Sequence, residues 1–307
     1  MIDFRYHVVS IVAVLFALAI GIIFGSGFLG GALLNRLDTA LDDLDRRNQE
    51  LLRDLRELRQ FADESERPLV QGALQGRDVL VFTAEGTDTA TVDGVRDAIG
   101  IAGGAVIGTV EATTRLELED PDERALLAEM LASDATGADA LRRDTARLLA
   151  ARAVAAASFS FDRPRIGPTA DGRLLEMLED FGAENFLQTD GFDEADPTVP
   201  PGSMFVIVAG NADPAPLGWR GFVTALATNL AVRDVTVLVA EPSASAWGIV
   251  DSICDDAADR VSTVNQADTV PGRVGVVLTL KAGPAVGHHG VGACAEDGII
   301  PAPEQAG

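Results

Sequence analysis

The sequence predicts an α/β protein in which an N-terminal transmembrane helix and a parallel coiled coil precede a mostly parallel sheet covered by helices. Three observations lead to this prediction: a long uncharged apolar run, a leucine heptad repeat directly after it, and short apolar runs that alternate with helical patterns. The expected segments are a short N-terminal region (1–7), a transmembrane signal anchor (8–33), a coiled coil (34–66), a linker (67–76), an acidic α/β domain (77–281), and a glycine-rich loop with the C-terminal tail (282–307).

The first element is an uncharged segment from Val8 to Leu34, which is 27 residues long. About 20 apolar residues are enough to cross a bilayer, so this segment predicts a transmembrane helix. A cleaved signal peptide is the alternative, because Ala17-Leu18-Ala19 resembles a cleavage site. The apolar run continues for another fifteen positions, which favours an uncleaved anchor. We expect a single-pass protein of the cell membrane or envelope, with the N-terminus inside and the C-terminal domain extracytoplasmic.

Small residues recur every four positions within this segment, at Ala13, Ala17, Gly21 and Gly25. Such a stripe lets two helix backbones approach closely, so Gly21 and Gly25 are candidate contact residues between two transmembrane helices. The alternative is that they carry no contact, because glycine and alanine are common in membrane helices anyway.

The second element is a leucine repeat with 3-4 spacing, which holds for four heptads from Leu34 to Ala62. Polar and charged residues fill nearly all other positions, and a seam this narrow predicts a coiled coil rather than a helix lying on its own core. One a position is Asn48, which favours parallel pairing, and we expect a homodimer. The candidate dimerisation residues of the seam are Leu37, Leu41, Leu44, Asn48, Leu51, Leu55 and Leu58.

The third element is the α/β domain, which we expect to begin after Pro68 ends the preceding helix. The predicted strands are 78–84, 105–110, 203–209, 235–240 and 273–280. The predicted helices are 88–102, 121–133, 137–157, 172–183, 217–232 and 245–258. Strands that are apolar throughout and alternate with helices indicate a mostly parallel sheet. Asp120, followed by Pro121, is interpreted as an ordinary helix cap rather than a metal ligand.

Charge and composition exclude several classes of function. The chain carries 24 basic and 47 acidic residues, a net charge of −23, and residues 76–307 hold −20 of it. This argues against a nucleic-acid partner, because phosphate binding requires a basic face. Lys281 is the single lysine, and there are three histidines. No phosphate-binding, hydrolase or zinc-protease motif occurs, so we expect a protein that is not an enzyme.

One loop near the C-terminus contains candidate metal ligands. The stretch GPAVGHHGVGAC places His288, His289 and Cys294 together, and imidazole and thiolate are good ligands for copper. Partners from a second chain would complete such a site. The alternative is a glycine-rich turn whose histidines pack or face solvent. Cys254 is interpreted as a buried core thiol, because it shares a helical face with apolar residues.

These segments resemble the mycobacterial copper transport protein B (MctB) family. The resemblance rests on HVVSIVAVLFALAIGIIFGSGF, the leucine repeat, VLVFTAEGTD followed by IAGGAVIGTV, and STVNQADTVPGRVGVVLTL followed by GPAVGHHGVG. Relatives carry a Gly-His-Tyr-Gly-like sequence where this chain has Gly287-His288-His289-Gly290. The resemblance implies a membrane-associated envelope protein of copper transport or homeostasis, with copper as the expected ligand.

A second hypothesis about function stays open beside copper transport. One apolar helix forms no pore, and the four methionines make no copper relay. The alternative is a non-catalytic dimeric envelope scaffold that recruits protein partners through its coiled coil and acidic domain, for example in cell-wall remodelling.

Overall fold

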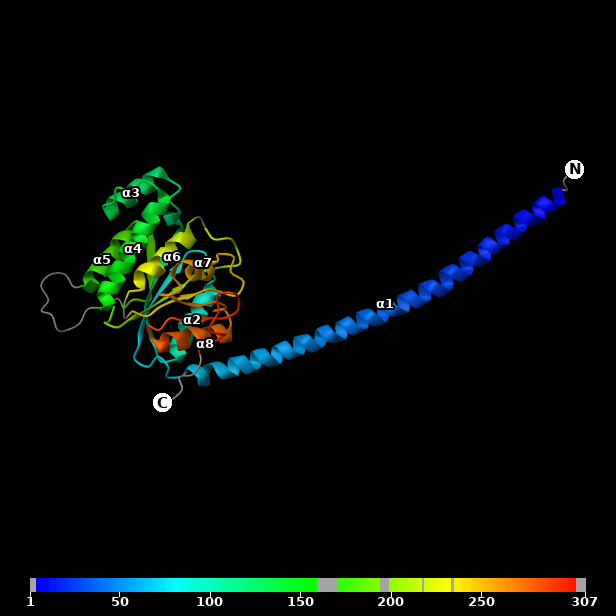
Figure 1. The fold of residues 1–307 in the computed structure, drawn as a ribbon. Helices are drawn as coiled ribbons and strands as arrows, with labels where there is room; N and C mark the ends of the chain where they lie inside the picture. The colour runs from blue at the N-terminus through cyan, green and yellow to red at the C-terminus, as the bar shows by residue number, and fades with distance from the viewer. Residues whose placement is uncertain (1–3, 159–169, 194–198, 217, 233–234, 302–307) are drawn as a thin grey trace. The chain divides into compact units, whose positions relative to one another are not determined.

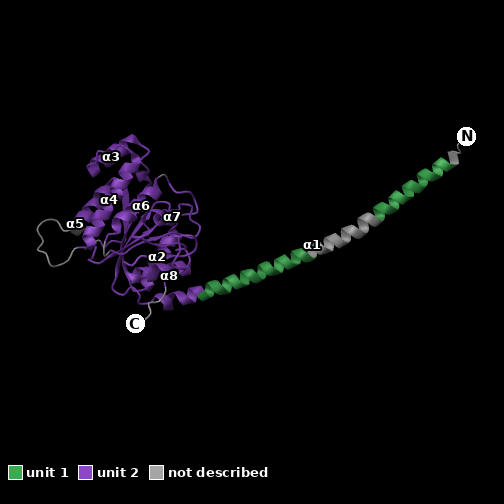
Figure 2. Ribbon diagram, viewed as in Figure 1, with its two compact units in different colours: residues 1–61 green, residues 62–307 purple. Residues whose placement is uncertain are grey.

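A computed structural model of the protein describes residues 4–158, 170–193, 199–216, 218–232 and 235–301. Within these ranges, only the backbone is described for residues 4–5, 24–38 and 170–172. The chain divides into two compact units, residues 1–61 and 62–307 (Figure 2).

The first unit is helical. Helix α1 is continuous from Phe4 to Val70, so its last turns belong to the second unit. Its stretch Tyr6–Ile23 is 18 residues long, has no buried residue, and is apolar enough to cross a membrane by length and composition. The prediction that Pro68 ends the helix was wrong, because α1 includes Pro68 and ends two residues later. A proline this close to the C-terminus removes its N–H only from the last turn, which limits the cost.

The second unit is an α/β domain built on a seven-stranded sheet. The strand order is β3-β2-β1-β4-β5-β6-β7, and the pairing is parallel throughout except between β2 and β3. The strands are β1 (Asp78–Ala84), β2 (Ala105–Ala112), β3 (Leu187–Asp190), β4 (Met204–Val208), β5 (Val237–Ala240), β6 (Ser262–Val264) and β7 (His288–His289). The predicted mostly parallel α/β class is therefore confirmed.

Helices cover both faces of this sheet (Figure 1). They are α2 (Thr89–Ile101), the 3₁₀ helix η1 (Thr114–Glu117), α3 (Pro121–Leu131), α4 (Ala138–Ala157), α5 (Ala170–Ala183), α6 (Trp219–Leu230), α7 (Ile249–Ala257) and α8 (Val270–Ala282). Helices α2 and α8 pack with Val79 and Val81 of β1 in one core, while α4 to α7 pack with Leu80 and Phe82 in the other. Successive side chains of a strand point to opposite faces, so β1 contributes to both cores.

The prediction of a strand at 273–280 was wrong, because this run lies inside helix α8. The side chain of Thr269 caps the helix by accepting a hydrogen bond from the Gly272 N–H, and Pro271 lies in its first turn. A side chain at Gly272 would collide with the Gln266 carbonyl, so the turn into α8 requires glycine. An apolar run of this length does not by itself distinguish a buried helix from a buried strand.

One other local prediction is confirmed. Asp120 accepts a hydrogen bond from the Asp122 N–H at 2.8 Å and so caps α3, with Pro121 in the first turn. Trp219 is 1% exposed and belongs to the core. The strands that sequence reasoning missed are β3, β6 and β7, which contain four, three and two residues. Strands this short have too few residues to show a pattern.

The end of α1 is fixed to the α/β domain by an ion pair and by burial. The Arg273 guanidinium donates two parallel hydrogen bonds to the Glu66 carboxylate, at 2.8 and 2.9 Å, and the two side chains are only 19% and 12% exposed. The hydrogen bond that Arg273 donates to Glu66 is the main cause that raises the pKa of Arg273 above its ordinary value. Val70 and Leu74 follow with no exposed surface, which anchors the helix end in the α2–α8 core.

We expect Glu66→Gln to lower the free energy of unfolding of the α/β domain by about 1–3 kcal/mol, because Arg273 would lose a charged partner in a mostly buried position. Urea denaturation of the full chain in detergent, followed by tryptophan fluorescence, measures this directly. Both tryptophans, Trp219 and Trp247, are buried in this domain. The control is Asp259→Asn, whose carboxylate is 82% exposed in its pair with Arg260 and should leave the midpoint unchanged. Equal effects of both variants would contradict the prediction.

Candidate metal centre

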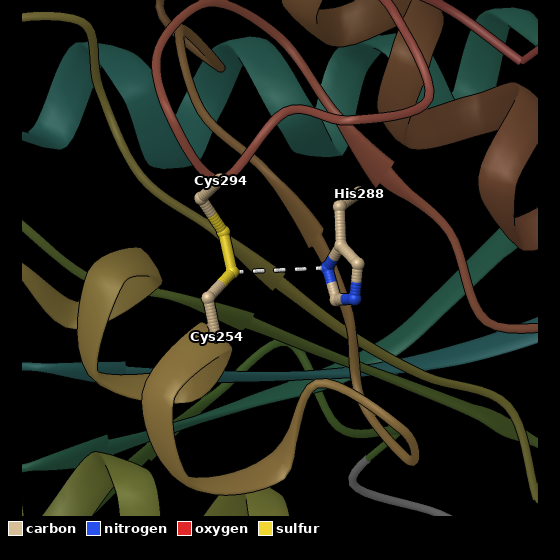
Figure 3. A group of neighbouring side chains, drawn as sticks. All are labelled: Cys254, His288 and Cys294. Carbon is tan, nitrogen blue, oxygen red and sulfur yellow. Dashed lines mark hydrogen bonds between the residues drawn. A yellow bond between two sulfur atoms is a disulfide. The ribbon is translucent and has the colours of Figure 1, made fainter.

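The candidate site lies at the β6–β7 edge of the sheet, where three elements meet. Strand β7 pairs in parallel with β6, so that His288 lies beside Thr263 and His289 beside Val264. Helix α7 contributes Cys254, and the loop that follows β7 contributes Cys294 (Figure 3). The site therefore combines one residue from a helix, one from a strand and one from a loop.

Helix α7 is held in place by a buried carboxylate. Glu241 is 5% exposed and accepts hydrogen bonds from the Ile249 N–H at 3.2 Å and the Val250 N–H at 2.9 Å. It also accepts one from the Ser245 hydroxyl. A carboxylate at the start of a helix satisfies N–H groups that have no partner within the helix and complements the helix dipole. This fixes the part of the chain that carries Cys254.

The loop after β7 is held by side chains that bond to its backbone. The Asn265 amide accepts from the Val291 N–H at 2.7 Å and donates to the carbonyl of the same residue. The Asp297 carboxylate accepts from the His288 N–H at 2.8 Å. Gly290 has φ +126°, and a side chain there would collide with Asn265. The turn therefore depends on this glycine, and it directs the loop back toward α7.

Cys254 and Cys294 form a disulfide with their Cα atoms 6.1 Å apart (Figure 3). The Nδ1 atom of His288 lies 3.9 Å from Cys254 Sγ, and the two sulfurs and one ring nitrogen all lie within 4.8 Å of one another. All three residues are half-buried. Among the described residues, this is the group whose geometry could hold a metal ion.

The hydrogen bonds of His288 define the state of its ring. Nε2 lies 2.8 Å from the Ala258 carbonyl, and a carbonyl only accepts, so Nε2 carries a proton. In the neutral ring the lone pair is then on Nδ1, which accepts from the Thr263 hydroxyl at 2.9 Å. The nitrogen that has the lone pair is thus the one beside the two sulfurs.

The structure brings His288 and Cys294 together and adds Cys254. The interpretation of Cys254 as a buried core thiol was wrong, because it is half-buried and disulfide-bonded. His289 is not part of the group. It follows His288 in a strand, where successive side chains point to opposite faces, and it is 7% exposed. Its Nδ1 is buried and has no hydrogen-bond partner among the described residues, and burial lowers its pKa.

Sequence reasoning missed Cys254 as a partner of the loop because 40 positions separate the two cysteines. The number of cysteines was the signal that could have found it. A chain that has two cysteines and is expected outside the cytoplasm can form one disulfide, between Cys254 and Cys294.

The candidate dimerisation residues all lie in α1. Leu41, Leu44, Leu51, Leu55 and Leu58 are exposed, at 47% to 64%, and Asn48 is exposed beside them. A side chain at Gly21 would meet nothing within 4 Å. Gly25 and Leu37 are helical in backbone, and their side chains lie outside the described residues.

These features define a class of membrane or envelope protein, in which an N-terminal apolar helix carries an α/β domain with a cysteine and histidine cluster. The chain belongs to the MctB family, described as "Copper transport outer membrane protein, MctB", whose family model matches residues 1–300. The copper transporter MctB of Mycobacterium tuberculosis strain H37Rv is 29% identical over 95% of this chain and 97% of the relative. The copper transporter MctB of Mycobacterium leprae strain TN is 27% identical over 98% of this chain and 100% of the relative. The resemblance stated from sequence is therefore confirmed.

We expect Cys294→Ser to lower the free energy of unfolding by about 2–4 kcal/mol, because the disulfide closes a long loop and restricts the unfolded chain. Urea denaturation followed by tryptophan fluorescence measures the change. Treatment of the unaltered protein with a dithiol reductant is the matched control and should lower the midpoint by the same amount. A midpoint that stays constant after complete reduction would contradict the prediction.

Proposed function

We propose that the protein serves copper transport or homeostasis in the cell envelope, without catalysing a reaction, as a single-pass protein with its α/β domain outside the cytoplasm. Membership of the MctB family supports the link to copper. The observation that carries the proposal for this chain is the convergence of Cys254, His288 and Cys294 from three elements. Thiolate and imidazole are ligands that copper prefers. Copper is therefore the expected cargo, and this group is its binding site.

The same proposal includes a parallel homodimer joined along α1. The leucines of the heptad seam are exposed in the single chain, and burying such side chains stabilises a pair of helices. Chains anchored in one membrane face must pair in parallel, as the asparagine at an a position also favours. The stripe at Gly21 and Gly25 offers a second contact within the membrane.

The second candidate function is a non-catalytic envelope scaffold. The exposed seam favours it, because a long apolar stripe outside a core requires a partner. The net charge of −20 over residues 76–307 gives the domain a surface that would select a basic protein partner. Copper binding at His288 separates the two functions, because the scaffold does not need it.

We expect His288→Ala to weaken copper binding by about tenfold or more. Replacing a residue that only hydrogen-bonds to a metal ligand typically costs 10–100-fold in metal affinity, and removal of a ligand itself should cost at least as much. The measurement is competition between the reduced full-length protein in detergent and a chromogenic Cu(I) chelator. The matched control is His7→Ala in α1, which removes a histidine outside the group and should leave the affinity unchanged. If both variants bind copper like the unaltered protein, the site is not at His288 and the scaffold function gains.

We expect Leu41→Cys to form a disulfide between two chains under mild oxidation, because identical a positions of a parallel coiled coil face each other. Non-reducing gel electrophoresis of the membrane-embedded protein detects the crosslinked dimer. The control is Arg46→Cys, which occupies the outward f position of the same heptad and should crosslink far less. Equal crosslinking at both positions would contradict the parallel seam.

A further inference from the structure

We propose that the Cys254–Cys294 pair is a redox gate on a Cu(I) site: the disulfide excludes copper, and the reduced pair binds one Cu(I) ion through two thiolates and His288 Nδ1. This inference rests on the proposed copper function and adds the oxidation state of the cargo and the control of its binding.

The first argument is that a cysteine sulfur cannot be part of a disulfide and bind copper as a thiolate at the same time. In the structure the two sulfurs are bonded to each other, so neither is a thiolate. The thiolate is the form of cysteine that binds metals. The imidazole of His288 alone would offer a single ligand, which does not make a specific site. Copper binding at this group therefore requires that the disulfide be opened first.

The second argument is that the opened pair fits a three-coordinate ion. Metal bonds of about 2.0–2.3 Å separate the ligand atoms of a trigonal centre by roughly 3.5–4 Å. The Nδ1 atom of His288 is already 3.9 Å from Cys254 Sγ. Cys294 Sγ lies within 4.8 Å of the same nitrogen, so the main change required is that the two sulfurs move apart. The Cα separation of 6.1 Å leaves room for that within the side chains.

The third argument is that the histidine is prepared for a metal. Its Nε2–H is held by the Ala258 carbonyl at 2.8 Å, which is the outer hydrogen bond that metal-binding histidines typically make. Its Nδ1 must release the Thr263 hydroxyl, which lies 2.9 Å away. The same hydroxyl is 3.9 Å from Cys294 Sγ, so it can rotate to donate to the thiolate instead. When the Thr263 hydroxyl rotates, it loses its hydrogen bond to His288 and gains one to the Cys294 thiolate.

The fourth argument concerns which ion such a group selects. Two thiolates and one imidazole form a soft ligand set, which favours Cu(I). Zn²⁺ also binds two cysteines and one histidine, but it then completes its tetrahedron with a fourth ligand such as water. The described group offers three ligands, which is a complete set for a three-coordinate Cu(I) ion.

The fifth argument is that one side of the pair can move while the other is fixed. Cys254 is in α7, whose start is held by the buried Glu241. Cys294 is in a loop that Asn265 holds at Val291, but Gly292 and Ala293, which lie between that point and the cysteine, are exposed. Opening the disulfide thus allows Cys294 to shift while Cys254 and His288 keep their positions. The half-buried sulfurs also remain within reach of a small reductant.

The redox step balances with a dithiol as the reductant. A thiolate of the dithiol attacks one sulfur of the pair and forms a mixed disulfide, which the second thiol of the reductant then resolves. Two electrons and two protons pass to Cys254 and Cys294, and the reductant leaves as a cyclic disulfide. Binding of Cu(I) then releases both thiol protons to solvent. A small-molecule disulfide carries out the reverse exchange and expels the ion.

The test compares the oxidised and reduced states of the full chain in detergent without oxygen. Each state is titrated with Cu(I) against bathocuproine disulfonate after the reductant has been removed. We expect one Cu(I) per chain in the reduced state and at least a tenfold weaker affinity in the oxidised state. Cys254→Ser and Cys294→Ser should each bind weakly with or without reductant. X-ray absorption at the copper edge should show two sulfur ligands and one nitrogen ligand in the reduced complex.

His288→Ala removes one copper ligand but keeps both cysteines and their disulfide. Weak copper binding by this variant would therefore come from the lost ligand and not from a lost fold. We expect this variant to form the disulfide normally and to bind Cu(I) about tenfold or more weakly once reduced. Equal Cu(I) affinity in the oxidised and reduced states would overturn the gate while leaving a copper function in place. Absence of copper binding in both states would overturn the gate and the proposed function together.

Discussion

The structure depends on the complete burial of its central strands. The side chains of β4 and β5 are buried on both faces, and those of β1 are nearly so. Backbone N–H and C=O groups in such a setting must find partners within the sheet, because water is absent. Helices that connect successive parallel strands cover both faces of the sheet and so keep these side chains away from water. The short strands β6 and β7 extend the sheet to the edge where the cysteines and His288 meet.

Much of the fold could be predicted because its central strands are apolar and its helices carry ordinary caps. The β1 segment and the Asp120 cap are examples, because the local sequence predicts both and the folded domain contains both. The run at 273–280 was misread because α8 is buried on most of its surface, so it lacks the polar face that marks a helix. Its cap at Thr269 and its first-turn Pro271 are the stronger signals of a helix.

The candidate site was half predictable. His288 and Cys294 are close in sequence, and their chemistry drew attention to the loop. Cys254 was not predictable as their neighbour, because the contact depends on how α7 and β7 lie at the same edge of the sheet. The separation of His289 from His288 follows from strand alternation, but a two-residue strand leaves no pattern from which to read it. Long-range packing therefore supplied what local sequence could not.

The disulfide also changes how the C-terminal part of the chain is connected. The bond joins two cysteines that are 40 positions apart in the sequence. It therefore closes a covalent ring of the chain that contains β6, α8 and β7. A protease that cuts once inside this ring leaves the two fragments joined, and only reduction releases them. The link between Cys254 and Cys294 therefore makes the cleavage pattern of this region on a gel depend on the redox state of its surroundings, quite apart from any metal.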